Sequence, residues 1–243
     1  MRTLIHGDCA NWDTPCDCIF MDPPDNIGLG YHDYKDIRTD YFPWLAKLIS
    51  KAINLAPIVW VSYNAIHDIN LKKWLGQSPA LWGKEVRTII WFYTFCQYND
   101  KDLSHGYRPI LLIKTPWTGY PGRIREESER MRLGDARAAG PKIPSDVWDF
   151  PRVVGNSPER KSWHPTQHPV VLYDRIMKYS CAEGGHFVDY FGGTGTAFRA
   201  QLLNPTLRVT VIEQSKLYCD HIRKENNIID DSLYSCDPNR CTI

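Results

Sequence analysis

Three glycines and two strand-end acids mark the segment of the sequence that most strongly predicts ligand binding. Residues 186–197, HFVDYFGGTGTA, read as a strand ending at Asp189, a glycine-rich turn and the start of a helix. Such glycines let a ligand approach the backbone closely at a helix N-terminus. Glu213 ends the next strand, 24 residues after Asp189, where an acid can accept hydrogen bonds from a ribose diol. The pattern predicts a nucleoside-containing cofactor. Without Gly-x-Gly-x-x-Gly or Gly-Lys-Ser/Thr, it argues against NAD and a phosphate-binding loop.

A second candidate site is the segment MDPPDNIGLG, residues 21–30, in which two acids flank two prolines. The apolar run over 18–21 leads into it and predicts a buried strand. Pro23 and Pro24 donate no backbone hydrogen bonds and force an extended or turn backbone, so the strand must stop there. Asp22 therefore stands where a buried strand ends.

The elements that must position these segments alternate between strands and helices. Apolar and β-branched runs predict strands over 4–6, 18–21, 58–63, 86–95, 110–113, 186–190 and 209–212. Apolar residues at helical spacing predict helices over about 41–52 and 171–180, and a last helix near 217–222. This alternation predicts an α/β protein with a doubly wound, mostly parallel sheet covered on both faces.

The composition is that of an ordinary globular protein. Of 243 residues, 43% are hydrophobic and 23% charged, and no apolar run approaches the roughly 20 residues that span a bilayer. The N-terminus reads straight into a strand and lacks a signal peptide, which predicts a cytoplasmic protein. The eight cysteines form no Cys-x-x-Cys, and the pair His164 and His168 spans a proline with no cysteine close by. Reduced thiols and no metal are therefore expected.

Residues from about 115 to 162 interrupt the alternation of strands and helices. Six prolines and many charges fall there, which favours an inserted or appended small region. The stretch 101–163 carries a net charge of +4 and contains Arg123, Arg125 and Arg130. Both a solvated helix face with interleaved glutamates and a polyanion-binding surface fit this charge pattern.

In their order along the chain, these segments resemble the β class of the amino-methyltransferases of DNA. That family places a (Asp/Asn/Ser)-Pro-Pro-aromatic tetrad first, then a target-recognition region, a His-Pro-Thr-Gln-Lys-Pro segment and an Asp-x-Phe-x-Gly-x-Gly loop. This chain has DPPD at 22–25, HPTQHP at 164–169 and DYFGGTG at 189–195. It departs from the pattern twice, because Asp25 replaces the aromatic residue and His168 replaces the lysine.

The resemblance implies a Rossmann-like methyltransferase sheet in circularly permuted order. Residues 1–97 would form the catalytic half, 98–162 the target-recognition region and 163–243 the cofactor-binding half. The implied cofactor is S-adenosylmethionine, with Glu213 on its ribose hydroxyls and Asp8 on its adenine amino group. Thr166 and Gln167, at the start of a helix, would bind its methionine carboxylate. The other implied cofactor contacts are Cys9, His164, Pro165, Asp189, Phe191, Gly193, Gly195 and Thr196.

The resemblance also implies a role for Asp22. The exocyclic amine of a base is a poor nucleophile because its lone pair is delocalised into the ring. Asp22 and the carbonyl oxygen of Pro23 would accept hydrogen bonds from the amine, favour a more tetrahedral nitrogen and direct its lone pair at the methyl group. The base must first leave its stack, which costs a few kcal/mol.

Asp25 cannot supply the stacking, worth about 1–3 kcal/mol, that an aromatic residue gives an extruded base. Tyr31 and Tyr34, in the same loop, are predicted to replace that ring. Two alternatives are that the stacking partner is missing, or that Asp25 accepts a hydrogen bond from the base or orders the loop 26–30.

The leading functional prediction is a site-specific adenine-N6 methyltransferase of double-stranded DNA, because an acid first in the tetrad is more usual among adenine enzymes. Cytosine-N4 methylation of DNA is the nearest alternative. An RNA amino-methyltransferase or a catalytically silent subunit that binds cofactor and DNA comes next. DNA as partner implies a nucleoid-associated protein, and relatives of this arrangement often form homodimers. No membrane and no metal are expected as partners.

Overall fold

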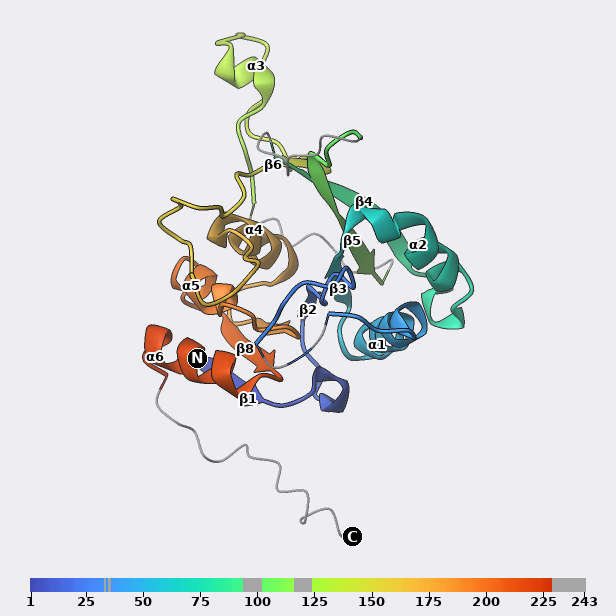
Figure 1. The fold of residues 1–243 in the computed structure, drawn as a ribbon. Helices are drawn as coiled ribbons and strands as arrows, with labels where there is room; N and C mark the ends of the chain where they lie inside the picture. The colour runs from blue at the N-terminus through green and yellow to red at the C-terminus, as the bar shows by residue number, and fades with distance from the viewer. Residues whose placement is uncertain (33, 35, 94–101, 116–123, 229–243) are drawn as a thin grey trace.

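Eight strands form one sheet in the computed structural model, which describes all residues except 33, 35, 94–101, 116–123 and 229–243. The strands are β1 Arg2–His6, β2 Cys18–Met21, β3 Ile58–Ser62, β4 Glu85–Phe92, β5 Tyr107–Lys114, β6 Val147–Asp149, β7 His186–Asp189 and β8 Arg208–Glu213. Their order across the sheet is β1-β8-β7-β2-β3-β5-β4-β6 (Figure 1).

Strand direction confirms the predicted mostly parallel sheet. Only β5 runs antiparallel to its neighbours, β3 and β4, among the described pairs. Every residue of β2 and β3 is buried, as expected of central parallel strands covered on both faces. The C-terminal strands β8 and β7 lie between β1 and β2. This order brings the glycine turn after β7 beside the loop after β2.

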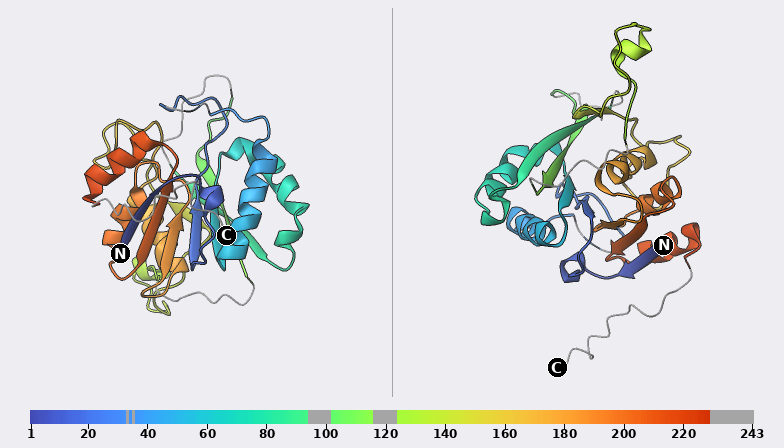
Figure 2. Two further views of the ribbon diagram at one scale, coloured as in Figure 1. Left: turned by 90° about the horizontal axis from the view of Figure 1, so that it is seen from below. Right: turned by 180° about the vertical axis from the view of Figure 1, so that it is seen from behind.

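Helices cover both faces of the sheet (Figure 2). They are α1 Tyr41–Leu55, α2 Asp68–Gly76, α3 Glu129–Arg132, α4 Val170–Ser180, α5 Thr196–Leu202 and α6 Lys216–Asn226. Side chains alternate across β2, so that Ile19 and Met21 pack with α1 and α2 while Cys18 and Phe20 pack with α4 and α5. Two apolar cores result, one on each face, and they fix the sheet edge at which the loops converge. None of the described helices is both long and apolar enough to cross a membrane.

The predicted elements match the observed ones closely in the central sheet. Strand β2 has the predicted bounds, and α4 begins one residue earlier than predicted. Strand β4 ends at Phe92, and residues 94 and 95 of its predicted range lie outside the described residues. The three-residue strand β6 and the helix α2 were not predicted. Neither segment has enough apolar residues at regular spacing to be predicted from sequence. Strand β6 buries only Trp148, and α2 buries only Leu71 and Leu75.

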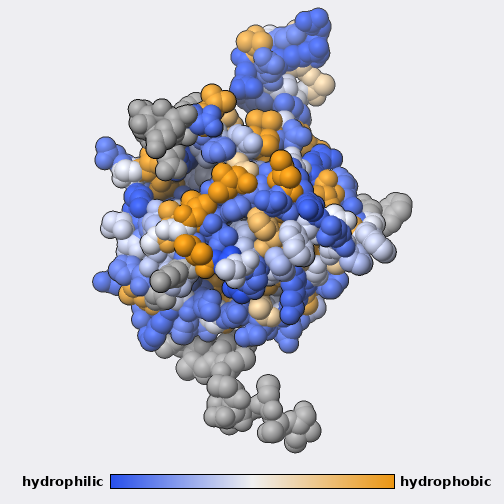
Figure 3. Space-filling model, turned by 45° about the vertical axis from the view of Figure 1, so that its right-hand side comes forward, coloured by the Kyte–Doolittle hydropathy of each residue, from blue (hydrophilic) through white to orange (hydrophobic). Residues whose placement is uncertain are grey.

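The interruption of the α/β pattern contains a projecting arm around α3, which we define as residues 124–146 (Figure 1). Strand β5 falls within 98–162 but pairs inside the sheet, so the part that projects is narrower than the predicted recognition region. Glu126 and Lys142 pair at the base of the arm, and Glu126 also contacts Arg175 on α4 at 3.2 Å. The arm presents a largely hydrophilic surface (Figure 3).

Candidate active site

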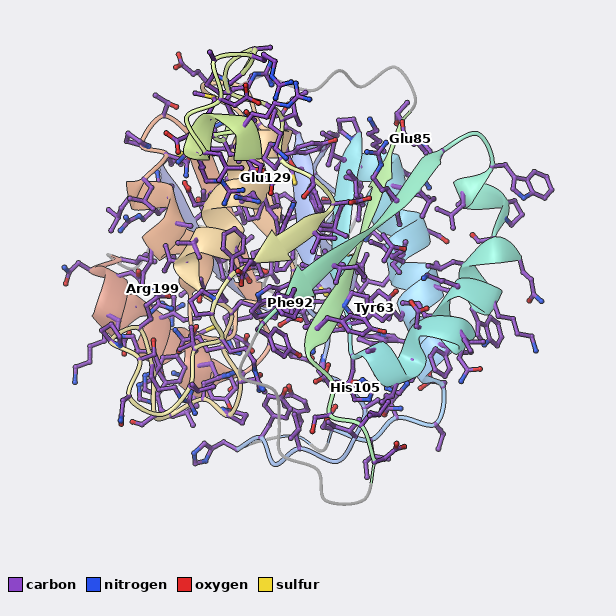
Figure 4. The ribbon with its side chains drawn as sticks, turned by 90° about the horizontal axis from the view of Figure 1, so that it is seen from above. Tyr63, Glu85, Phe92, His105, Glu129 and Arg199 are labelled. Atoms are coloured by element: carbon purple, nitrogen blue, oxygen red, sulfur yellow. The ribbon has the colours of Figure 1, made fainter. Side chains whose placement is uncertain are left out.

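Loops that follow β2, β3, β7 and β8 meet at one edge of the sheet, together with the start of the antiparallel β5. Figure 4 labels Tyr63, which follows β3, Phe92 at the end of β4, and Glu85 at the other end of that strand. A cavity of about 860 Å³ opens there, within the size range of small-molecule sites. It is lined both by the glycine turn and by the loop after β2. The two candidate sites of the sequence therefore form one cavity.

The glycine turn fits against β8 so closely that side chains are excluded. A Cβ at Gly192 would lie 2.7 Å from Cγ1 of Val211. Gly193 and Gly195 have φ values of +49° and +68°, which L side chains rarely adopt. The Gly195 N–H donates to the carbonyl oxygen of Gly192. The turn thus ends β7 and begins α5, with Gly192 and Gly193 presenting backbone to the cavity.

Glu213 and Asp189 lie on either side of this turn. One carboxylate oxygen of Glu213 accepts the N–H of Gly193 at 2.8 Å and the other accepts the N–H of Ser215 at 2.8 Å. Asp189 is fully buried, and its Oδ2 has no hydrogen-bond partner among the described residues. Burial raises the pKa of Asp189 well above its ordinary value. A buried acid with an unpartnered oxygen is the donor-seeking group that a bound polar ligand would satisfy.

Asp189 and Gly195 are not among the residues that line the cavity, whereas the other predicted cofactor residues are. Phe191, Cys9 and the exposed Asp8 line it, although one Asp8 oxygen caps a short turn by accepting the N–H of Ala10. His164, Pro165, Thr166, Gln167 and Thr196 line it as well. The Thr196 hydroxyl accepts from Arg199 at 2.8 Å.

The predicted placement of Thr166 and Gln167 at a helix start is wrong. Helix α4 begins at Val170, after Pro169, because the two prolines of the segment 164–169 favour extended backbone before the helix. The Gln167 side chain bonds the backbone of the preceding loop, accepting from Lys161 and donating to Glu159. It therefore orders that loop.

His164 packs against the glycine turn and keeps a buried, neutral ring. A Cβ at Gly193 would come within 3.5 Å of its Nε2. Burial lowers the pKa of His164 to about 4. Its Nδ1–H donates to the carbonyl oxygen of Thr166, so Nε2 of the neutral ring is the acceptor at the wall of the cavity.

Asp22 stands where β2 ends, and two cationic or donor side chains hold it. Its Oδ1 lies 2.8 Å from Nη2 of Arg108, and its Oδ2 lies 2.9 Å from Nδ1 of His168. Burial by itself raises the pKa of Asp22, but His168 and Arg108 outweigh burial and leave this pKa well below its ordinary value. Asp22 is therefore an ionised acceptor beside the glycine turn's cavity.

Asp25 faces Arg108. Its two oxygens accept from Nη2 and Nη1 of Arg108 at 2.8 and 3.2 Å. The alternative that Asp25 orders the loop 26–30 is wrong, because Asp36 does so by accepting the N–H groups of Asn26, Ile27 and Leu29. That Tyr31 or Tyr34 replaces the stacking ring, or that the stacking partner is missing, stays a prediction.

Aromatic rings line the cavity on both sides of Asp22. Tyr31 and Tyr34 stack on each other with ring centroids 4.4 Å apart, and the Tyr31 ring meets His164 edge-on. On the other side, Trp91 and Tyr93 at the end of β4 lie 5.4 Å apart. All four rings line the cavity.

Sequence reasoning missed Ser62 and Arg108 as site residues and noted His168 only as a departure from the family pattern. Ser62 ends β3 and Arg108 is the second residue of β5. The sequence carried one positional signal, a lone arginine directly before the apolar run 109–113. An arginine is rarely buried unless it is paired. Without the antiparallel direction of β5, that arginine could not be assigned to the edge where Asp22 lies.

The arginines predicted to bind DNA lie in or near the arm. Arg123 lies outside the described residues, whereas Arg125 and Arg130 are exposed. The arm holds five basic and five acidic residues, so its charge alone does not make it a polyanion site. In the described part of the chain, no group of three or more His, Cys, Asp or Glu side chains is placed to hold a metal ion.

Comparison with known families agrees with the order of these segments. The family described as DNA methylase, with N6 and N4 amino groups as its targets, matches residues 16–224. The chain belongs to this family. Its members are S-adenosylmethionine-dependent methyltransferases, which agrees with a cavity lined by a glycine turn and the strand-end acid Glu213.

Curated relatives align over most of the chain. The chain is 29% identical over 215 residues to the DNA adenine methyltransferase YhdJ of Escherichia coli, covering 80% of this chain and 72% of that protein. It is 25% identical over 205 residues to the type II methyltransferase M.ScaI of Streptomyces caespitosus, covering 74% of this chain. It spans 65% of the length of M.ScaI.

Solved structures share the fold. The M1.HpyAVI–SAM complex superposes with a TM-score of 0.65 at 17% identity, covering 94% of this chain and all of that one. The cytosine-N4-specific PvuII DNA methyltransferase gives a TM-score of 0.62 at 13% identity, covering 95% of this chain and 87% of that one. The Rossmann-like methyltransferase architecture is thus confirmed.

Proposed function

We propose that this chain transfers a methyl group from S-adenosylmethionine to the N6 amino group of adenine in double-stranded DNA. One observation carries the proposal: the ionised Asp22 faces the same cavity as the glycine turn and Glu213. An acceptor for an amine and a cradle for a nucleoside cofactor thus share one enclosed space. Family membership supports the reaction class.

The chain's own part in the reaction is to bind and orient the amine. When bound, S-adenosylmethionine supplies an activated methyl group. Asp22 and the carbonyl oxygen of Pro23 accept the two N–H groups of the amine, so that its lone pair points away from both acceptors. Pro23 and Pro24 add no donors that would compete for the carboxylate, and they limit the freedom of the loop. Holding the two reactants in line is the main catalytic contribution.

The cofactor contacts follow the sequence prediction, adjusted for the geometry. Glu213 would accept the ribose hydroxyls with lone pairs not used by Gly193 and Ser215. Asp189 offers its unpartnered buried oxygen to the amino group at the methionine end. Asp8, Cys9 and Phe191 would line the adenine side. The segment His164, Pro165, Thr166 and Gln167, with Gly193, Gly195 and Thr196, would enclose the methionine end.

Stacking of the extruded base is assigned to Tyr31 or Tyr34, because no ring stands at Asp25. Each tyrosine changed to Ala should lower the rate of a single turnover on DNA with a mismatch at the target base, if its ring is the platform. Tyr93→Ala is the matched comparison, since that ring lines the cavity from the end of β4. If Tyr31→Ala and Tyr34→Ala keep the wild-type rate while Tyr93→Ala is slow, the stacking ring would be assigned to Tyr93 at the end of β4 instead.

The choice between adenine and cytosine is the finest part of the proposal. The relative YhdJ is named an adenine methyltransferase, whereas the PvuII enzyme, which shares the fold, is cytosine-N4-specific. An acid at position 22 favours adenine. The test is to incubate the protein with labelled S-adenosylmethionine and DNA of mixed sequence, digest the product to nucleosides and identify the labelled one. Label in N4-methyldeoxycytidine would select the alternative, and label in RNA alone would reject DNA as substrate.

Recognition of the DNA sequence is assigned to residues 98–162, between the catalytic residues 1–97 and the cofactor-binding residues 163–243. The exposed Arg125 and Arg130 project on the arm, and Arg123 belongs to the same run. Changing all three to Gln should weaken DNA binding and flatten its dependence on salt, because each phosphate contact releases counterions. Lys216→Gln, on the exposed face of α6, is the control. An unchanged salt slope would make the arm a solvated surface.

A further inference from the structure

A group of polar side chains from four segments surrounds Asp22. Arg108 is its centre: Nη2 contacts both Asp22 and Asp25 at 2.8 Å, Nη1 contacts Asp25 at 3.2 Å, and Nε donates to Ser62 Oγ at 2.7 Å. His168 lies on the other side, with Nε2 3.1 Å from Ser62 Oγ and Nδ1 2.9 Å from Asp22. Side-chain exposure is 15% for Arg108, 11% for Asp25 and 9% for His168.

The direction of these hydrogen bonds follows from the donors. A guanidinium only donates, so Ser62 Oγ is the acceptor of the Arg108 Nε–H. The Ser62 hydroxyl is then free to donate its own hydrogen to Nε2 of a neutral His168, which assigns the ring's hydrogen to Nδ1. A charged His168 carries a hydrogen on Nδ1 as well. In either state the chain Arg108, Ser62, His168 ends in an N–H that donates to Asp22.

Asp25 is what holds Arg108 in this position. Its carboxylate meets the two terminal nitrogens of the guanidinium, an arrangement that fixes the plane of the fork. Around the Asp25 loop, Asn64 approaches its Oδ2 at 3.4 Å and His67 bonds its carbonyl oxygen. Asp25 is therefore anchored on both backbone and side chain.

We propose that Asp25 and His168, the two departures from the family pattern, are positioning residues for Asp22. Arg108, held by Asp25, clamps one oxygen of Asp22, and His168 clamps the other. Asp25 acts only through Arg108, and Ser62 links Arg108 to His168. The inference rests on the proposed function, because it assigns a purpose to the orientation of Asp22 toward an amine.

The clamp explains how Asp22 can accept a hydrogen bond from the target amine while it stays ionised. With one strong donor on each oxygen, the carboxylate keeps its charge and has one direction left on each oxygen for the target amine. Its lowered pKa makes it a poor base. Other ionisable groups close enough to interact with Asp22 are Tyr31, Tyr41, His164, Tyr173 and Asp189.

The central test is a double-mutant cycle with Asp25→Asn, Arg108→Gln and both together. Each single variant should lower the single-turnover rate of methyl transfer by between about tenfold and a hundredfold, the range for misplaced reacting groups. Because Asp25 acts through Arg108, the double variant should be no slower than Arg108→Gln. Cofactor affinity, measured by calorimetry, should stay within about twofold of wild type. Independent, multiplying losses would overturn the proposal.

Two further variants guard against loss of folding. Arg108→Lys keeps the charge but not the planar fork, so it should fold like wild type, by its thermal unfolding curve, and still lose most of the rate. Glu85→Gln is the control, because it removes an ion pair with Arg87 and Lys114 outside the cavity. A Lys variant with the wild-type rate would show that the fork does not matter.

A readout without catalysis separates this inference from the proposed function. Carbon-13 NMR of labelled aspartate follows the titration of Asp22 directly. The midpoint should move to higher pH in Arg108→Gln and His168→Leu, which each remove a group that holds the pKa of Asp22 down, and stay in place in Glu85→Gln. If it moves while wild type methylates no DNA, the clamp stands and the proposed function fails. A midpoint that is unmoved by both Arg108→Gln and His168→Leu would overturn the clamp whatever the activity.

Discussion

The glycine turn after β7 and the loop after β2 build two halves of one cavity in different ways. The turn is local: a few consecutive residues and one acid on the adjacent strand make it, and backbone N–H groups and glycine torsions define its shape. The surroundings of Asp22 are non-local. They come from the ends of β2 and β3, the start of β5 and the segment before α4, joined by side-chain charges.

This difference separates two kinds of precision. The shape of the cradle, which is the glycine turn 192–195 with Glu213, is defined by backbone torsions. It therefore tolerates few substitutions, but it does not depend on charged side chains from several distant segments. A clamp of charged side chains is correct only when all its members are present, because removing one leaves another buried without its partner. Substitutions in the cradle should therefore act on cofactor affinity, and those in the clamp on the rate of transfer.

The largest expected effect tests that separation at Asp22. Asp22→Ala removes the acceptor of the amine, so methyl transfer should fall by at least about a hundredfold, as for other preorganised polar groups. Cofactor affinity should stay within a few-fold, because Asp22 does not contact the predicted anchors of the cofactor. Single-turnover transfer of labelled methyl groups and calorimetry give the two numbers. Full activity in this variant would remove the tetrad from the mechanism.

The corresponding test of the cradle is Gly192→Ala. Its Cβ would meet Val211 Cγ1 at 2.7 Å and Glu213 Cβ at 3.0 Å, and overpacking of this kind costs about 1–3 kcal/mol of unfolding free energy. Shifting Glu213 should also weaken cofactor binding. Gly76→Ala, where a Cβ meets nothing within 4 Å, is the control. Urea unfolding and calorimetry on both variants measure the effects, and equal stability of the two would contradict the close fit.

The same contrast explains how much the sequence could predict. Strand β2, the order of strand and glycine turn, and the acids Asp189 and Glu213 follow from contiguous patterns, and the structure brings them together. Helix α2 and strand β6 carry few apolar residues and become ordered through tertiary contacts, which local patterns do not encode.

The clamp could not be predicted because its members are distant in sequence. Arg108 lies 86 residues from Asp22, and its place depends on the antiparallel direction of β5. His168 was visible only as an unexplained replacement of a lysine. Likewise, Gln167 was assigned to a helix start from its motif, whereas the prolines on either side delay the helix and turn its amide to the loop 159–161.

A smaller effect is expected from Glu213→Gln, which keeps the shape of the cradle. One of the two oxygens that accept a backbone N–H is replaced by an amide NH2, whose nitrogen cannot accept, and the negative charge is lost. The dissociation constant of S-adenosylmethionine should rise about tenfold, or about 1.4 kcal/mol. Glu183→Gln, an exposed acid before β7, is the matched control. Calorimetry that finds no change would place the ribose elsewhere in the cavity.

The smallest predicted effect concerns His164, an ionisable ring that packs against Gly193. Burial lowers its pKa from 6.5 to about 4, so the unfolded chain binds a proton between these pH values that the folded chain does not. Stability therefore rises with pH across this window, and it falls as pH drops below about 6.5. From pH 7.5 to 5.5, His164 should account for a loss of about 1 kcal/mol of unfolding free energy.

His164→Asn tests this assignment, because an amide NH2 can donate to the Thr166 carbonyl oxygen in place of Nδ1–H and does not titrate. The variant should lose less stability than wild type between pH 7.5 and 5.5. Burial also lowers the pKa of His186, which adds a slope of the same sign to both proteins, so the difference between their urea-unfolding curves isolates His164. Parallel curves for the two proteins would mean that the ring is protonated in the fold. The cradle would then carry a charge close to the cofactor's own sulfonium, and the contrast between a neutral backbone cradle and a charged clamp would fail.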